Sequence, residues 1–126
     1  MMRLSPEEFG QLVDEALETL PAWVGEKMDN VAITVAPWPT SSQLDSVRRQ
    51  RGPNTMLLGL YEGIPLTLRG RGYHLAAPDR ITLFQRPLEL HTQDSAQLVR
   101  LIQHTIVHEI GHHFGMSEEA LRELGL

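Results

Sequence analysis

The residues of this chain that could do chemistry are concentrated in the segment HEIGHHFGMSEE, residues 108–119. On a helix, side chains four residues apart lie one above the other, so His108 and His112 would point into the same space and could bind one metal ion. Glu109 lies roughly a quarter-turn from His108 and could reach a metal-bound water without coordinating the metal itself. The spacing therefore predicts a metal site with a general base.

The predicted metal is zinc, and the predicted chemistry is hydrolysis of an amide bond. Because the chain has no cysteine, any zinc must be held by histidine and carboxylate ligands. One bound zinc ion lowers the pKa of its water towards roughly 7. Glu109 would take the remaining proton and deliver it to the leaving amine.

A third ligand is predicted from the residues that follow the helix. Gly115 can adopt the left-handed conformation that ends a helix and turns the chain back. Glu118 follows three positions later and supplies a hard oxygen that could complete a three-ligand site with one open position. Glu118 could instead be an ordinary first-turn acid of a helix capped by Ser117, and both roles stay open.

The remaining histidines and tyrosines are weaker candidates. His104 lies one turn before His108 on the same side, and we expect it to be exposed or to support the ligands. For His113 the helical spacing predicts a buried position at the edge of the core, away from the metal. Met116 is expected to be a packing residue. Four other residues could stabilise an oxyanion, but the sequence does not place them near the metal: Tyr61, Tyr73, His74 and His91.

Length and charge limit the classes of function. The 126 residues fit one domain, 1–126. The net charge of -5 argues against binding to nucleic acid or to an anionic membrane. No apolar segment is long enough to span a membrane, and the N-terminus lacks the basic start and apolar run of a signal peptide. We therefore expect a cytoplasmic protein, monomeric or a small homo-oligomer.

The elements that must position the motif alternate between helices and strands. Ser5 and Glu8 form a predicted capping box for an amphipathic helix that ends before Pro21. The alternating run at 31–36 predicts a strand. The polar stretch 40–54, with its basic cluster of Arg48, Arg49 and Arg51, is expected to be a mobile surface loop that is solvated or touches an acidic partner.

The second half of the chain predicts the sheet and the helix that carries the motif. Residues 55–61 and 64–69 read as a hairpin, and residues 80–85 as the last strand. A long helix then follows the cap Asp94 and ends at Gly115, and its apolar residues surround most of its circumference. Ser117 caps a short final helix. This order predicts an α+β fold.

The motif and its flanking segments resemble a known family. HEIGHHFGMSEE, preceded by LLGLYEGIPLTLR and RITLFQRPLEL, is similar to the small bacterial zincin-like metallopeptidases called minimal zincins, over nearly the whole chain. The resemblance implies a small mixed sheet packed on a central active-site helix, with His108 and His112 as zinc ligands and Glu109 as the catalytic residue. The family commonly has aspartate where this chain has Glu118. The resemblance also makes RITLFQ (80–85) the candidate strand for binding an extended peptide by strand addition.

Two functions follow from the sequence. The first is a zinc-dependent metallopeptidase that acts on a peptide or protein substrate. The second is a catalytically inactive zincin-fold protein that serves as a binding or dimerisation module, with or without metal. A metal-dependent nuclease fits less well, because the small rRNA-maturation metalloproteins carry three histidines and have no glutamate beside the first.

Overall fold

The computed structural model describes residues 3–52, 56–63 and 79–123. The chain runs through nine elements in these ranges: α1 (Pro6–Glu18), α2 (Ala22–Lys27), β1 (Val31–Ala36), α3 (Ser41–Arg51), β2 (Gly59–Glu62), β3 (Asp79–Phe84), α4 (Gln85–Leu90), α5 (Ser95–His113) and α6 (Glu118–Glu123). This mixture of helices and strands confirms the predicted α+β class. No helix in the described ranges is long and apolar enough to cross a membrane.

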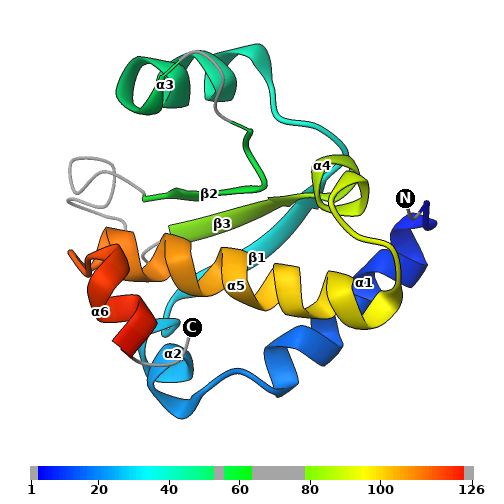
Figure 1. Ribbon diagram of the computed structural model, residues 1–126, viewed down its shortest axis with the longest axis horizontal. Coiled ribbons are helices and arrows are strands. Elements are labelled where there is room, and N and C mark those ends of the chain that lie inside the picture. Colours follow the sequence, from blue (N-terminus) through cyan, green and yellow to red (C-terminus); the bar gives the residue numbers. More distant parts are fainter. Residues whose placement is uncertain (1–2, 53–55, 64–78, 124–126) are drawn as a thin grey trace, which may run out of the picture.

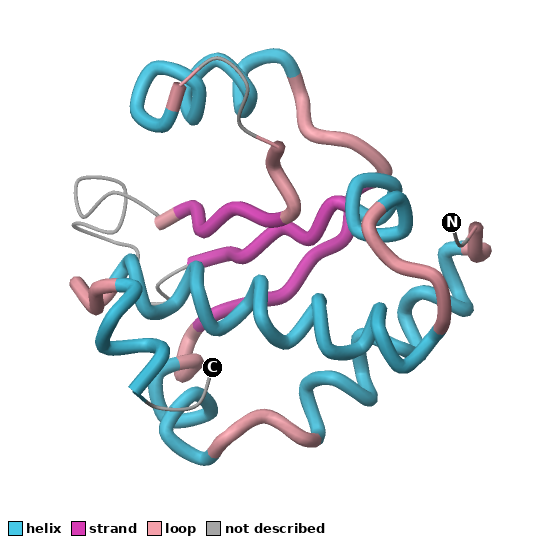
Figure 2. Tube along the Cα trace, in the orientation of Figure 1, coloured by secondary structure: helices cyan, strands magenta, loops and turns pink. Residues whose placement is uncertain are grey.

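The three described strands form a small mixed sheet, as the resemblance implied, and their order is β1-β3-β2 (Figure 2). β1 runs parallel to β3, with Val31 opposite Asp79, and β2 runs antiparallel to β3, with Gly59 opposite Leu83. The central strand is therefore β3. Figure 1 shows α5 lying along the sheet, with α1 beside it and α3 on the other side of the strands.

The main core lies between the sheet and α5. Alternate residues of a strand face opposite sides, so Ile81 and Leu83 of β3 share one face. They form one buried cluster with the isoleucines of α5 and with Phe9 of α1. The residues of this cluster that are fully buried include Phe9, Ile81, Leu83, Ile102, Ile106 and Ile110. Burial of α5 against the sheet, which its apolar residues predicted, is thus confirmed.

On the opposite face of the sheet, α3 packs against Phe84, and here the sequence prediction was wrong. Residues 41–51 are a helix rather than a loop, because Thr40 and Gln43 form a capping box in which each side chain accepts a hydrogen bond from the other's backbone N–H. Val47 is buried in a second cluster with Phe84, and Leu44 packs against the same cluster. Two apolar residues three apart are enough to hold a short polar helix when a sheet lies beneath it.

Other predicted elements are largely confirmed. The Ser5 and Glu8 capping box begins α1, and β1 spans the predicted 31–36. Asp94 accepts a hydrogen bond from the N–H of Gln97 and caps α5, whereas the Gln97 side chain accepts from Gln93. The first arm of the predicted hairpin is shortened to β2, and the second arm, 64–69, lies outside the described residues. The short helices α2 and α4 were not predicted.

The end of α5 turns the chain back onto the helix. Gly115 has φ 79°, the left-handed conformation expected of it. The N–H of Met116 donates to the carbonyl of Gly111 at 2.7 Å and that of Gly115 to His112 at 3.1 Å, a Schellman motif. Ser117 caps α6 as predicted, since its hydroxyl accepts from the N–H of Ala120. Leu121 of α6 is buried in the main core.

Close contact between β2 and α5 depends on a glycine. A Cβ at Gly59 would lie 2.6 Å from Cγ2 of Thr105 on α5 and 3.2 Å from the backbone oxygen of Thr82 on β3. Real Cβ atoms do not approach other heavy atoms this closely, so a side chain at position 59 would push the edge strand away from the helix. Gly59 therefore sets the separation of β2 from α5.

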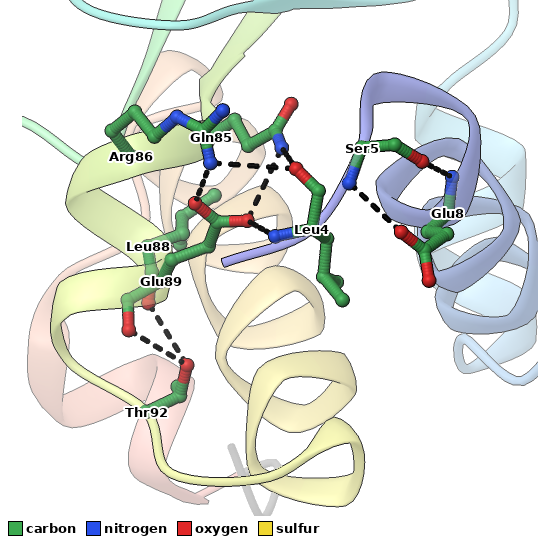
Figure 3. A network of polar contacts seen from close by, with 8 residues as sticks. All are labelled: Leu4, Ser5, Glu8, Gln85, Arg86, Leu88, Glu89 and Thr92. Atoms are coloured by element: carbon green, nitrogen blue, oxygen red, sulfur yellow. Dashed lines mark hydrogen bonds and ion pairs between the residues drawn. The ribbon is translucent and has the colours of Figure 1, made fainter. Parts of the chain in front are cut away.

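A buried carboxylate fastens the start of the chain to α4 (Figure 3). Glu89 is 1% exposed, and its Oε2 accepts the N–H of Leu4 at 2.8 Å and the side-chain amide of Gln85 at 3.1 Å. Its Oε1 accepts from the guanidinium of Arg86 at 2.6 Å. Gln85 also donates to the carbonyl of Leu4 at 2.9 Å. Each buried polar group shown in this network has a partner, which is what makes a buried charge tolerable.

We expect Gly59→Ala to destabilise the protein by about 1 to 3 kcal/mol, because the added methyl group overpacks the contact with Thr105. The double variant Gly59→Ala/Thr105→Ser removes the clashing methyl group and should recover part of the loss. Gly10→Ala on α1, where a Cβ meets nothing within 4 Å, is the control and should be neutral or stabilising. Urea unfolding measures all three. Equal stability of the two alanine variants would contradict this account of the β2 contact.

We expect Glu89→Ala to lower the free energy of unfolding by about 3 kcal/mol, because it leaves the guanidinium of Arg86 and the N–H of Leu4 without their acceptor. Glu15→Ala on the exposed side of α1 is the matched control, with an expected change within about 0.5 kcal/mol. Chemical denaturation followed by circular dichroism gives both values. A loss as small as that of the control would show that the network adds nothing to stability.

Candidate active site

The predicted motif lines one pocket between α5 and the edge of the sheet. The pocket has a volume of about 220 Å³, and the residues around it are Arg51, Met56, Leu57, Leu58, Gly59, His104, Thr105, His108, Glu109 and His112. His108, Glu109 and His112 therefore open into the same space, as their helical spacing predicted. The other wall comes from the segment that leads into β2 and from the last residue of α3.

The two histidines present their rings to this pocket from successive turns of α5. His108 is half-buried and His112 is exposed. Their ring centroids are 5.8 Å apart and the ring planes are nearly perpendicular, at 85°. Two imidazoles on one helix face, both open to one pocket, are a donor pair that suits zinc. The described residues thus fit two ligands of the predicted site.

Glu109 is held by β2, which lies at the edge of the sheet that the described strands form. Only 8% of the residue is exposed, and Oε1 accepts a hydrogen bond from the backbone N–H of Tyr61 in β2 at 3.0 Å. Oε2 lies 4.0 Å from Nη2 of Arg51 at the end of α3. The carboxylate is therefore fixed in direction by a donor on one oxygen, while the other oxygen has a guanidinium nearby. The sequence did not indicate either contact.

The strand beside the site is β2, and the prediction for residues 80–85 was wrong. β3 pairs with β1 on one side and with β2 on the other, so its two edges are already occupied and it cannot accept an added strand. The N–H of Phe84 donates to the carbonyl of Leu58. Since alternate residues of an antiparallel strand point their backbone groups to opposite sides, Gly59 and Tyr61 direct theirs away from β3, and the Tyr61 N–H reaches Glu109 of α5.

Tyr61 and His113 contact each other, and neither is among the described residues that line the site pocket. The Tyr61 hydroxyl donates to Oδ2 of Asp79 at 2.6 Å, and the ring stacks on His113 with centroids 3.9 Å apart. His113 is exposed, so the predicted buried position is wrong. It is the last residue of α5, beyond the buried isoleucines, and its ring covers the tyrosine instead of entering the core.

The other weak candidates fall in different places. His104 is exposed, as one of its predicted alternatives required, and its ring lies against that of His108 with centroids 3.9 Å apart. The sequence indicated this contact, because His104 lies one turn before His108 on the same helix.

His91 is not among the pocket residues, and its Nδ1 lies 2.8 Å from the carbonyl oxygen of Pro87. Met116 packs against the main core as predicted. Tyr73 and His74 lie outside the described residues.

The third ligand stays a prediction. Glu118 is the first residue of α6, and its side chain lies outside the part of the chain that the structure describes. Within residues 3–52, 56–63 and 79–123, no three histidine, aspartate or glutamate side chains are arranged to hold a metal ion. The turn at Gly115 does bring α6 back against α5, because Leu121 packs where Gly111 has no side chain. That return of the chain is what a ligand from α6 requires.

Comparison with known proteins agrees with this geometry. The family of zincin-like metallopeptidases matches residues 28–126, a range that includes all three strands, α5 and α6. No curated protein matches the chain. The matched range contains the two pocket histidines, Glu109 and the turn at Gly115, and it covers most of the chain. The chain belongs to the zincin-like metallopeptidase family.

Proposed function

We propose that the protein is a zinc-dependent peptidase in which His108 and His112 bind the metal, Glu118 is the third ligand and Glu109 is the general base. One observation carries the proposal. The carboxylate of Glu109 and both histidine rings line a single pocket beside the outward-facing backbone of β2. A hydrolytic metal site needs its base, its ligands and a place for an extended substrate within a few ångströms.

The contacts of Glu109 assign different roles to its two carboxylate oxygens in this proposal. Bound zinc would supply an activated water as the nucleophile and polarise the substrate carbonyl. Oε1 is held by the Tyr61 N–H, so Oε2 is the oxygen left to take a proton and pass it to the leaving amine. Because the residue is almost fully buried, the carboxylate keeps this orientation between the two transfers.

The substrate would lie as an extended strand along the outer edge of β2. Gly59 and Tyr61 both direct backbone groups to that side, and the Tyr61 N–H is already used by Glu109. Gly59 is therefore the residue whose backbone would pair with a peptide, and it also lines the pocket.

A second function, a catalytically inactive binding or dimerisation module, is supported by the same carboxylate. Glu109 joins α5 to β2 through its hydrogen bond with Tyr61, which is a structural role that needs no metal. The described residues also supply two ligands rather than three. The two functions are distinguished by measuring the zinc affinity of the parent protein and the peptide hydrolysis of the Glu109→Gln variant.

We expect the metal-stripped protein to bind one zinc ion, and His112→Ala to weaken that binding by about a hundredfold or more, because it removes a ligand. Glu118→Ala should weaken it as well. His113→Ala is the matched control, since this neighbouring histidine is exposed and is not among the pocket residues. Isothermal titration and elemental analysis give affinity and stoichiometry. An unchanged affinity in Glu118→Ala would exclude Glu118 as a ligand, and no binding by the parent would exclude the zinc site.

We expect Glu109→Gln to keep zinc binding and to lower peptide hydrolysis by about a hundredfold to ten-thousandfold. The amide oxygen can still accept the Tyr61 N–H, so the strand and helix stay joined, whereas an amide cannot carry the proton. Mass spectrometry of a peptide library incubated with each zinc-loaded protein measures cleavage. Stoichiometric zinc in the parent without cleavage of any peptide would favour the binding module.

A further inference from the structure

A row of basic side chains runs along one face of α5. Arg100, His104, His108 and His112 follow one another at four-residue spacing, which places them on successive turns of the same face. Beside the site pocket there is a second, open pocket, lined by His91, Thr92, Gln97, Arg100, Leu101 and His104. His104 belongs to both linings. The two pockets therefore adjoin along the helix, and we refer to them together as the α5 groove.

The charges of the α5 groove are opposite to those of the whole chain. The sequence carries a net charge of -5. Two of the residues around the groove are the permanent cations Arg51 and Arg100. Among the lining residues whose side chains the structure describes, which do not include Glu118, Glu109 is the one acidic residue. A positive groove on an acidic protein attracts anionic ligands locally while the rest of the surface repels them.

Arg51 is placed to bind a second carboxylate. Its Nη2 atom is 4.0 Å from Oε2 of Glu109, beyond the range of a hydrogen bond, so the two interact by charge alone. Its side chain is 43% exposed. Within the described part of the chain, this ion pair is the one polar contact of the Arg51 guanidinium. The planar fork of the guanidinium can therefore form paired hydrogen bonds with a carboxylate that enters the pocket.

We propose that the α5 groove selects acidic extended peptides, with Arg51 binding a carboxylate next to the bond that is cut and Arg100 binding one further along. This inference rests on the proposed peptidase function. Glu109, which lies beside Arg51, and Arg100 are nine residues apart on α5, or roughly 13 Å along the helix, which an extended peptide covers in about four residues. The preferred peptide thus has two carboxylates about four residues apart.

The test measures binding of fluorescein-labelled eight-residue peptides to the zinc-supplemented full chain by fluorescence anisotropy. One peptide has two glutamates four residues apart, and its partner has glutamine at both positions. Each is made with a free and with an amidated C-terminus, so that side-chain and terminal carboxylates are distinguished. Mass spectrometry of the same samples reads any cleavage.

We expect the glutamate peptide to bind about tenfold more tightly than the glutamine peptide at low salt, with the difference shrinking as salt is added. Arg51→Gln should remove most of the preference and Arg100→Gln part of it. Arg49→Gln is the matched control, because Arg49 is an exposed arginine of the same helix that lines neither pocket. This control should keep the full preference. A preference that depends on the free C-terminus would identify the bound carboxylate as the terminal one.

Several results would overturn the inference. The first is equal or absent binding of the two peptides, and the second is an equal loss of the preference for the glutamate peptide in Arg49→Gln and Arg51→Gln. The third is stronger displacement of the labelled peptide by a single-stranded oligonucleotide than by the unlabelled acidic peptide. Cleavage of all four peptides without regard to charge would also overturn it and leave the peptidase function standing. Charge-dependent binding without zinc uptake or cleavage would instead contradict the peptidase function and leave the acidic-peptide groove intact.

Discussion

The structure of the site depends on one hydrogen bond, from the backbone N–H of Tyr61 to Oε1 of Glu109. It joins the edge strand β2 to the helix that carries both histidines. The bond can form because Gly59 lets β2 approach Thr105 more closely than any residue with a Cβ would allow. A buried carboxylate without such a donor would cost free energy. The same hydrogen bond therefore fixes both the separation of β2 from α5 and the orientation of the Glu109 carboxylate.

The rest of the fold holds α5 in the position that this bond needs. The isoleucines of the helix are buried against β3, which leaves the histidine face turned towards the edge of the sheet. At one end of the domain, Glu89 fastens the segment at Leu4 to α4. At the other end of α5, the turn at Gly115 returns the chain as α6. The helix therefore gains its fixed position from packing on one face and remains polar on the other.

Membership of the zincin-like family and the features of this chain explain different parts of the pocket. The family match covers the helix with the two histidines and Glu109, and it accounts for the proposed peptidase chemistry. The charge of the groove comes from residues outside the motif. Arg51 reaches the pocket from α3, a helix on the other face of the sheet, and Arg100 lies two turns before His108 on α5. In these proposals, the residues for catalysis lie within the motif, whereas the arginines for selectivity lie outside it, one on α3 and one on α5.

Features set by neighbouring residues could be predicted from the sequence. The spacing of His108 and His112, the caps at Ser5 and Asp94 and the helix end at Gly115 follow from local backbone geometry, and each is found as expected. Features that join distant segments could not be predicted from the sequence. The pairing order makes β3 central, Val47 of α3 is buried with Phe84 of β3, and His113 stacks on a tyrosine 52 positions earlier in the chain. Local geometry therefore determined the motif, whereas the tertiary structure decided which strand and which arginines surround it, because those contacts depend on segments that meet only after folding.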